Sequence, residues 1–599
     1  MDGVINAFKS NSSKDLIDRL TDFNLKVSAL KNNWSTPLTH ALLDTKQNAQ
    51  TMVLEDNVSK KKQMLEGLFR VLRDPDRTED HFLVVCCLRI MTRDSKGLDV
   101  LFTADRMETI LHLANLVGEE EAYMTDKSKD FDARIVVEAL KCLCNLIYNN
   151  SVIQRLSCHN STIDGIMLRM KMYKDPSLPM EVKYFDMRML FLLTALCPDV
   201  RPRVRDEYHG LIYLMEAIDL IVKSTQDPAE RNQKKSLRKR SGRGRPSKSL
   251  PGSKAAPTTE SPPESEQQHY LTDEEVNLII EVLKVLFNLT CNLDRKVSDE
   301  IEEAHFMRLV AILHDLLLSE TRNKDRKEEI QSHTINLLTN MPTSTYDELL
   351  VSVEEIGKID NPLYEYEDTN VEAIAVILEF LDRRLTPSPE KSEAKQIHES
   401  IAPVLICLSE MARNKRVIRK YIKTRILPPL KDVHHRPEEG DTLRNKLVKQ
   451  MTNPNTDVKE LVADLLFVVC KESVGRLIKY TGYGNAAGLL ARRGLMMGGR
   501  RSDNYSSESE DSDTEEYLQY KDKINPVLGC YEPSRPNPLE GMSDEQKEHE
   551  AMELVHMIDK MTRTGVVKPC RVGSDGKPHP VDHILQLQEE MKEQEYESD

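Results

Sequence analysis

Apolar residues recur at three- and four-residue steps from about Ser13 to about Ser224, in segments such as KKQMLEGLFRVL, ETILHLANLV and YFDMRMLFLLTAL. This spacing puts them on one face of a helix and predicts successive amphipathic α-helices. Short polar or proline-containing breaks, such as RDPDRTED and KDPSLP, separate them. The helical pattern resumes at Leu271 and continues to about Met496. No run of alternating apolar and polar residues indicates strands, so the pattern predicts an all-α fold.

One helical unit occurs more than once along the chain. The stretch ALKCLCNLIYN at 139–149 matches VLKVLFNLTCN at 282–292 without a gap, and NLLTN at 336–340 repeats the shared Asn-Leu-x-x-Asn core. Armadillo and HEAT units are about as long as the 48 residues that separate Asn288 from Asn336. The repetition predicts an armadillo/HEAT-like α-solenoid, in which each layer of helices packs on its neighbours.

Changes in composition divide the predicted solenoid into N-terminal repeats at 1–225 and C-terminal repeats at 269–496. The segment between them, 226–268, is rich in Lys, Arg, Ser, Pro and Gly, and it has too few apolar residues to order itself. Its RGRP sequence at 243–246 resembles a motif that enters A·T-rich minor grooves, and the basic run could serve in nuclear localisation. A solvated, disordered loop is the interpretation we favour, because the whole chain carries a net charge of −15. We therefore expect no nucleic-acid partner.

The repeated asparagines form the first candidate site. In a helix, residues four apart lie on the same face, so each pair of asparagines projects together and the pairs of successive layers form a row. Such amides can bind the backbone of a peptide in a groove, or they can hold neighbouring helix ends together. For the row as a whole we favour a ligand groove. Its members are Asn145, Asn149, Asn288, Asn292, Asn336 and Asn340.

Two arginines occupy the corresponding places upstream, in CCLRIMTR. Arg89 and Arg93 are again four residues apart. A guanidinium group binds a carboxylate through two parallel hydrogen bonds. We therefore expect this end of the row to bind an anionic group, with a carboxylate as the natural guest.

Composition excludes several other classes of protein. The eleven cysteines include no CxxC pair and mostly lie in apolar helical runs, which indicates a reducing compartment and no metal site. No apolar run reaches the roughly 18 residues of a membrane span, so we expect a cytosolic chain without an integral membrane segment. The sequence offers no arrangement of nucleophile, base and orienting group, and its GxGxxxG motif at 482–488 follows no predicted strand. No catalytic residue or cofactor is expected, and we expect a monomer.

The C-terminal region changes character again. An acidic, serine-rich linker at 497–542 contains Ser507 and Ser512, each with a glutamate three residues later, which is the spacing that acidophilic kinases of the casein-kinase type recognise. The alternative is a plain solvated tract. A helix is predicted at 543–564, and we expect most of 565–599 to be disordered. The helix carries an apolar stripe of Met552, Leu554, Val555, Ile558 and Met561.

Several of these strings, together with LPPLKDVHHRPEEGDTLRNKLVKQM, IKYTGYGNAAGLLARRGLM and NPLEGMSDEQKEHEAMELVHMIDKM, resemble the synembryn family (resistance to inhibitors of cholinesterase). That family comprises cytosolic exchange factors and folding chaperones of heterotrimeric G-protein α subunits (Gα). The resemblance covers roughly 61–561. The segment 226–268 and the tail after Thr564 match nothing that we can place.

The resemblance implies that a groove of the solenoid receives the C-terminal helix of Gα. Arg89, Arg93 and Asn145 would receive its terminal residues, and the family's two phosphorylation sites correspond to Ser507 and Ser512. The C-terminal helix would help to hold Gα open and free of nucleotide. Recruitment to the cell cortex or plasma membrane would follow from binding Gα. The alternative is an armadillo-type adaptor or scaffold that binds peptides without exchange activity.

Overall fold

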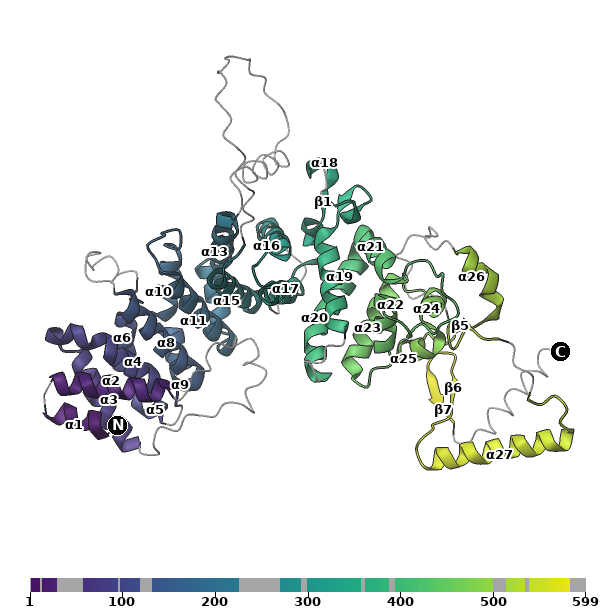
Figure 1. Cartoon of the computed structure of the whole chain (residues 1–599), viewed down its shortest axis with the longest axis horizontal. Helices are drawn as coiled ribbons and strands as arrows, with labels where there is room; N and C mark the ends of the chain where they lie inside the picture. The colour runs from purple at the N-terminus through teal and green to yellow at the C-terminus, as the bar shows by residue number, and fades with distance from the viewer. Residues whose placement is uncertain are drawn as a thin grey trace, which may run out of the picture. The chain divides into compact units, whose positions relative to one another are not determined.

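The computed structural model describes residues 2–10, 13–29, 58–94, 97–118, 132–225, 270–291, 293, 299–356, 361–386, 394–498, 513–533 and 538–581. The chain divides into two compact units, Met1–Pro342 and Thr343–Asp599. Helices dominate both units, which confirms the predicted all-α solenoid (Figure 1).

The described residues of unit 1 form helices. Its elements are α1 (Asp2–Ser10), α2 (Ser13–Ala29), α3 (Val58–Leu72), the 3₁₀-helix η2 (Pro75–Asp80), α4 (His81–Met91), α5 (Leu98–Leu101), α6 (Ala104–Leu113), α8 (Ala133–Asn149), α9 (Ser151–His159), α10 (Thr162–Met170), α11 (Met180–Leu196), α12 (Val200–Pro202), the π-turn η3 (Arg203–Glu207), α13 (Gly210–Thr225), α15 (Asp273–Thr290), α16 (Glu300–Leu318) and α17 (Lys324–Leu338).

Five of these helices stand side by side in one row, each packed against the next. They are α4, α8, α11, α15 and α17, and we call them the ladder row. The leucines shared by the two repeats lie in the core, since Leu140, Leu143 and Leu286 are all fully buried. Their burial supplies the hydrophobic free energy that holds successive layers together. Side-chain caps define where the helices begin: Asp132 caps α8, and Thr272 forms a capping box at α15.

The boundary between compact units is not where we expected it. We placed the break at the segment 226–268, but α13 and α15 on its two sides pack against each other inside unit 1, and α16 also packs against α13. These helices therefore pack together although the segment 226–268 separates α13 from α15 in the sequence. The segment itself lies outside the described residues. A composition change therefore did not mark a domain boundary here.

Unit 2 also consists mainly of helices, with several very short strands. Its elements are η4 (Thr343–Leu349), β1 (Val351–Ser352), α18 (Val353–Ile356), η5 (Pro362–Tyr364), β2 (Glu365–Tyr366), β3 (Thr369–Asn370), α19 (Glu372–Leu385), α20 (Ala394–Asn414), α21 (Arg416–Ile426), α22 (Leu443–Gln450), α23 (Thr456–Val469), α24 (Val474–Thr481), α25 (Tyr483–Arg493), α26 (Glu515–Tyr520), η6 (Lys521–Lys523), β4 (Ile524–Asn525), β5 (Cys530–Tyr531), α27 (Asp544–Arg563), β6 (Cys570–Val572) and β7 (Pro578–Pro580).

The strands pair in three small antiparallel sheets. The first has the order β1-β3-β2, with Val351 and Glu365 both opposite Asn370. The other two are the hairpins β4–β5 and β6–β7. Strands of two or three residues are too short to show the alternation by which strands are recognised in a sequence, which explains why none was expected.

The structure also differs from our expectation for the tail. Residues 565–581, assigned to a mostly disordered tail, include the hairpin β6–β7, whereas 582–599 lies outside the described residues. None of the helices in the described part of the chain combines the length and the apolar character that crossing a lipid bilayer requires.

Candidate functional site

The asparagines of the ladder row follow one geometric rule. Asn145 of α8 donates from its Nδ2 to the carbonyl oxygen of Arg89 at 3.1 Å and to Oγ1 of Thr92 at 3.3 Å. Both acceptors belong to the C-terminal end of α4, the neighbouring helix. The Thr92 hydroxyl also donates to the Arg89 carbonyl oxygen, at 2.9 Å, so the amide adds a second donor to a carbonyl at the helix end.

The same contact recurs between α15 and α11 and between α17 and α15. Asn288 donates to the Phe191 carbonyl oxygen at 3.4 Å and to Oγ1 of Thr194 at 3.0 Å. Asn340 donates to the Phe287 carbonyl oxygen and to Oγ1 of Thr290, each at 3.1 Å. In these three pairs of helices, an asparagine donates to a carbonyl oxygen and to a threonine hydroxyl at the end of the preceding helix.

The third copy of the repeat is displaced by one helical turn from our alignment. We aligned Asn336 with Asn145 and Asn288, but it is Asn340 that makes their contact. Asn336 instead occupies the place held by Lys141 and Lys284, and its side chain makes no hydrogen bond with a described residue. Of the remaining members, Asn149 donates to the Thr92 carbonyl oxygen at 3.1 Å, and Asn292 lies outside the described residues.

These contacts support the second interpretation of the asparagines. Three equivalent amides, and Asn149 beside them, use their N–H groups to join the layers. Their Oδ1 atoms accept no hydrogen bond from any described residue, and all four side chains are half-buried. The Oδ1 atom of each amide can therefore still accept a hydrogen bond from a ligand, whereas the N–H groups are already used between the helices.

The two candidate arginines lie at the first end of this row. The Arg89 Nε atom forms an ion pair with Oε2 of Glu138 at 2.5 Å. Lys141 binds the other oxygen of Glu138 at 3.0 Å and also pairs with Glu181 of α11 at 3.0 Å. Burial, followed by the like charge of Arg89, lowers the pKa of the Arg93 guanidinium, and Glu138 opposes that shift. The cluster therefore brings the positive charges of Arg89, Arg93 and Lys141 together around Glu138.

A second cluster, which we did not predict, repeats this arrangement two layers further along. Glu281 of α15 pairs with Arg188 of α11 at 3.2 Å and with Lys284 at 2.6 Å. The Lys284 ammonium lies 4.6 Å from the ring centroid of Phe191, which suits a cation–π contact. Burial lowers the pKa of Lys284, and the same cause lowers the pKa of His333 to about 3, so that His333 is neutral near pH 7.

The sequence contained a signal for this second cluster. Glu138 precedes Lys141 by three residues, and Glu281 precedes Lys284 by the same number, so the repeat extends upstream of the part that we compared. A Glu and a Lys three residues apart face the same side of a helix. The arginines that complete each cluster come from the neighbouring helix, and a linear pattern does not reveal them.

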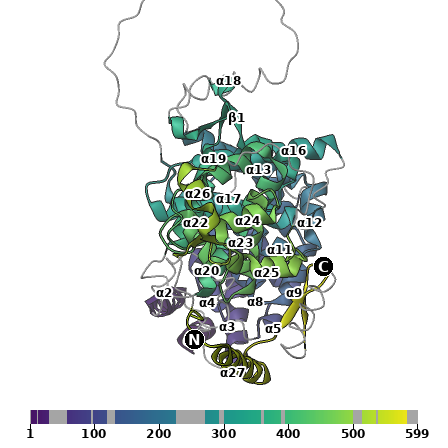
Figure 2. The same ribbon diagram turned by 90° about the vertical axis from the view of Figure 1, so that its right-hand side faces the viewer.

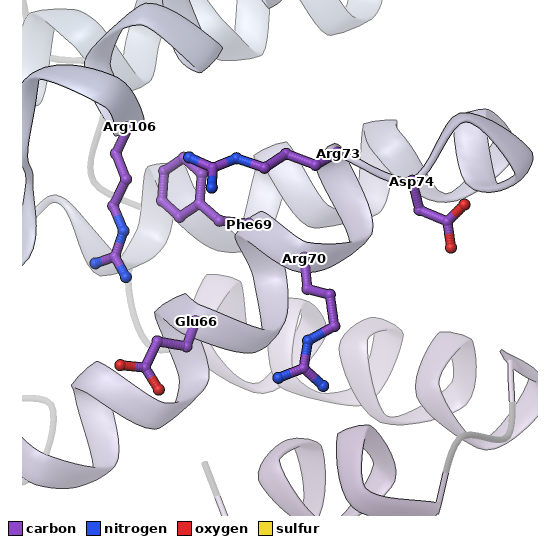
Figure 3. Close-up of a pocket in the computed structure, with 6 residues that line it drawn as sticks. All are labelled: Glu66, Phe69, Arg70, Arg73, Asp74 and Arg106. Atoms are coloured by element: carbon purple, nitrogen blue, oxygen red, sulfur yellow. The ribbon is translucent and has the colours of Figure 1, made fainter.

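A separate cleft of about 560 Å³ lies beside α3 and α6. Figure 3 shows its lining, with the guanidinium groups of Arg70, Arg73 and Arg106 around Phe69. Three carboxylates balance these three cations: Glu66 and Asp74 line the cleft, and Asp105 forms an ion pair with Arg73. Without an excess of positive charge, the cleft lacks the electrostatic basis of an anion site.

The two candidate phosphorylation sites, Ser507 and Ser512, lie outside the described residues. Asp513, the residue after Ser512, forms an ion pair with Lys479 of α24, with 2.5 Å between Oδ1 and Nζ. The hydrogen bond from Lys479 lowers the pKa of Asp513. Thr514 then donates its hydroxyl to the Leu430 carbonyl oxygen and caps α26. The acidic linker is therefore attached to the solenoid directly after Ser512.

The predicted C-terminal helix is present as α27. Ser543 and Gln546 form the capping box at its start. It has no buried residue, and about half of the surface of Met552, Leu554 and Met557 is exposed. Within the described residues α27 leaves these apolar side chains exposed, which is typical of a surface that binds another protein.

Comparison with known proteins identifies the family. Residues 84–577 match the family model described as "Guanine nucleotide exchange factor synembryn". The chain is 41% identical to "Chaperone Ric-8A" of Danio rerio, covering 84% of this chain and 85% of that protein. It is 38% identical to the Gallus gallus protein of the same name, covering 90% and 92%, and 37% identical to the Mus musculus protein, covering 94% and 96%.

Among solved structures, the crystal structure of SYS-1 aligns with 68% of this chain and 63% of that chain, at 11% identity and a TM-score of 0.34. That score is too low to support an argument. The family match and the three relatives each span most of the chain. The chain therefore belongs to the synembryn family of guanine nucleotide exchange factors.

Proposed function

We propose that this protein is an exchange factor and folding chaperone for G-protein α subunits, and that it binds the C-terminal helix of Gα along the ladder row. The observation that carries the proposal is the surface where α4 meets α8. There the Arg89 side chain pairs with Glu138, Arg93 follows one helical turn later, and Asn145 and Asn149 donate to backbone carbonyls of the same segment. The C-terminus of a polypeptide supplies both a carboxylate for the arginines and backbone N–H groups for the amide oxygens.

Exchange then requires no covalent chemistry. A partner shifts a conformational equilibrium by the difference between its affinities for the two states. A protein that holds the C-terminal helix of Gα binds the open, nucleotide-free form better than the GDP-bound form, and GTP drives its release. The same preference for an incompletely closed Gα suits a chaperone of nascent subunits.

The acidic linker supplies a point of regulation. Phosphorylation of Ser507 and Ser512 by an acidophilic, casein-kinase-type kinase would add negative charge directly before the contact between Asp513 and Lys479. The added charge would attach the linker more firmly to unit 2 and so restrict α27. We further propose that the protein acts as a monomer in the cytoplasm and reaches the cell cortex through Gα.

The experiment measures GDP release from purified Gα in the presence of the wild-type chain, with Gα lacking its C-terminal residues as the control. We expect faster release from intact Gα alone. An adaptor without exchange activity would bind the C-terminal peptide and leave the rate of GDP release unchanged, and that result would replace the proposal with the alternative function.

A further inference from the structure

The helix α27 lies between two segments that are both attached to the end of the solenoid in unit 2. Residues 524–531 precede it and the hairpin β6–β7 follows it. Figures 1 and 2 both show α27 standing clear of the helices of its own unit, in agreement with its lack of buried residues. Its position therefore depends on the two flanking attachments rather than on its own packing.

The first attachment accounts for the first two glycines of the GxGxxxG motif, Gly482 and Gly484. The backbone N–H of Tyr483 donates to the Pro526 carbonyl oxygen at 2.8 Å, and that of Gly484 donates to the Val527 carbonyl oxygen at 3.0 Å. Gly482 has a φ of +75°, and a Cβ atom there would lie 3.0 Å from the same Val527 oxygen. Glycine is needed because the loop approaches the backbone too closely for a side chain.

Further contacts fix the same segment. Tyr531 donates its backbone N–H to the Val433 carbonyl oxygen at 2.6 Å. The rings of His434, Tyr520 and Tyr531 pack edge to face, with centroids 4.9–5.4 Å apart. Such edge-to-face pairs stabilise a contact beyond the area that they bury. The chain is thus held by backbone and aromatic contacts before it enters the 532–543 connection to α27.

The second attachment lies where α25 ends. Gly494 ends that helix with a φ of +66°, and the backbone N–H of Leu495 returns to the Leu490 carbonyl oxygen at 2.8 Å. The Met496 N–H donates to the Gly576 carbonyl oxygen at 3.2 Å. Gly576, with a φ of +69°, approaches so closely that a Cβ atom there would lie 2.1 Å from the Gly494 carbonyl oxygen.

The hairpin that carries Gly576 is held in shape by its own polar contacts. His579 and Lys577 both bind Oδ1 of Asp575, through the ring at 2.9 Å and through the backbone N–H at 3.1 Å. The Gly573 N–H donates to the Lys577 carbonyl oxygen at 3.0 Å. A defined tip therefore meets α25, although all the strand residues are exposed.

From this geometry we propose that the Gly494–Gly576 contact is a positioning contact, which together with the Gly482 attachment holds α27 at both ends for its partner. The inference rests on the proposed function, in which that partner is Gα. Held only at its start, α27 would lose the restraint that the β6–β7 hairpin supplies after its other end. A second attachment confines the helix and raises its effective concentration at a bound Gα.

The test compares two valine substitutions in the full-length chain. Gly576→Val places side-chain atoms against Gly494 and detaches the hairpin. Gly565→Val is the matched control, because Gly565 has a similar φ of +73° but no atom within 4 Å of its Cβ position. Both variants therefore introduce the same kind of backbone strain, and only Gly576→Val disrupts the contact.

Three measurements are made on wild type and both variants. Hydrogen exchange at the Met496 amide reports the attachment directly, because that N–H donates to Gly576. Affinity for nucleotide-free Gα reports the function, and affinity for a Gα C-terminal peptide reports the groove alone. We expect Gly576→Val to expose the Met496 amide and to weaken binding of Gα about tenfold, with peptide affinity and melting temperature unchanged. Gly565→Val should behave as wild type in all three.

The possible outcomes distinguish a failure of the positioning contact from a failure of the proposed function. If Gly576→Val exposes the Met496 amide but binds Gα as tightly as wild type, the attachment exists and does not position α27, and the inference is overturned. Equal losses in both variants would assign the effect to strain and would also overturn it. If wild type itself binds neither Gα nor the peptide, the proposed function fails, whereas hydrogen exchange still reports whether the attachment exists.

Discussion

Replacing Asn288 with alanine separates the structural role of the ladder asparagines from a role in ligand binding. The variant loses hydrogen bonds to the Phe191 carbonyl oxygen and to Oγ1 of Thr194. Neither acceptor loses every partner, because the Thr194 hydroxyl still donates to the carbonyl oxygens of Leu190 and Phe191, at 2.8 and 3.1 Å. We therefore expect the free energy of unfolding to fall by about 1–2 kcal/mol, the value of the lost hydrogen bonds. No further cost arises, because the substitution leaves no buried polar group unpaired.

The matched control is Asn336→Ala. Asn336 is also half-buried on the ladder row, but its side chain makes no hydrogen bond with a described residue. We expect its stability to change by less than about 0.5 kcal/mol. Denaturant unfolding followed by circular dichroism measures both variants, and an unchanged m-value shows that the midpoints can be compared directly.

Peptide binding completes the comparison. The Asn336 amide retains both its donor and its acceptor groups, so Asn336→Ala should weaken binding of the Gα C-terminal helix more than Asn288→Ala does. The reasoning is refuted if Asn288→Ala leaves stability unchanged, or if Asn336→Ala destabilises the protein as much. Either result would mean that the hydrogen bonds between layers contribute nothing beyond the packing of the leucines.

Three further predictions concern the clamp, the basic segment and the linker. Arg89→Ala or Arg93→Ala should weaken binding of a Gα C-terminal peptide by about 1.5–3 kcal/mol in calorimetry; amidating the peptide should weaken wild type far more than the variants, and equal losses would contradict a carboxylate clamp. Deleting 226–268 should leave the melting temperature and GDP release nearly unchanged, because loop-closure entropy varies slowly with length; a large fall in either would assign the segment a structural or functional role. Treatment with an acidophilic kinase should speed GDP release in wild type but not in Ser507→Ala/Ser512→Ala, with the gain fading at high salt; equal rates in both proteins would leave the tract a solvated linker.

The helical architecture could be predicted because its signal is local and repeated. The three-to-four-residue spacing of leucines such as Leu143 and Leu286 specifies a buried helix face, and those residues are fully buried. The register of the third copy could not be predicted in the same way. Asn336 and Asn340 are one turn apart on the same face, so the pattern fits either of them, and only the contact with Phe287 and Thr290 selects Asn340.

The parts that sequence reasoning missed depend on contacts between distant residues. Glu138 meets Arg89 across two helices, and the β6–β7 hairpin is held where Gly576 approaches Gly494 and accepts a hydrogen bond from Met496. The strands of that hairpin are three residues long and exposed, and one of them, β7, begins and ends with proline. Nothing in its composition distinguishes such a segment from a solvated tail.

The ion pair between Arg89 and Glu138 sets a condition on any carboxylate that binds at the end of the ladder row. A guest must replace Glu138 as the partner of Arg89, and a half-buried carboxylate left unpaired would oppose that replacement. Glu138 also binds Lys141 at 3.0 Å, so it keeps a counter-ion when Arg89 turns to the guest. Arg93, whose charged form is disfavoured by burial and by Arg89, gains from a second carboxylate nearby. The exchange of one carboxylate for another would therefore leave no group without a partner, as the proposed binding and release of the Gα C-terminus requires.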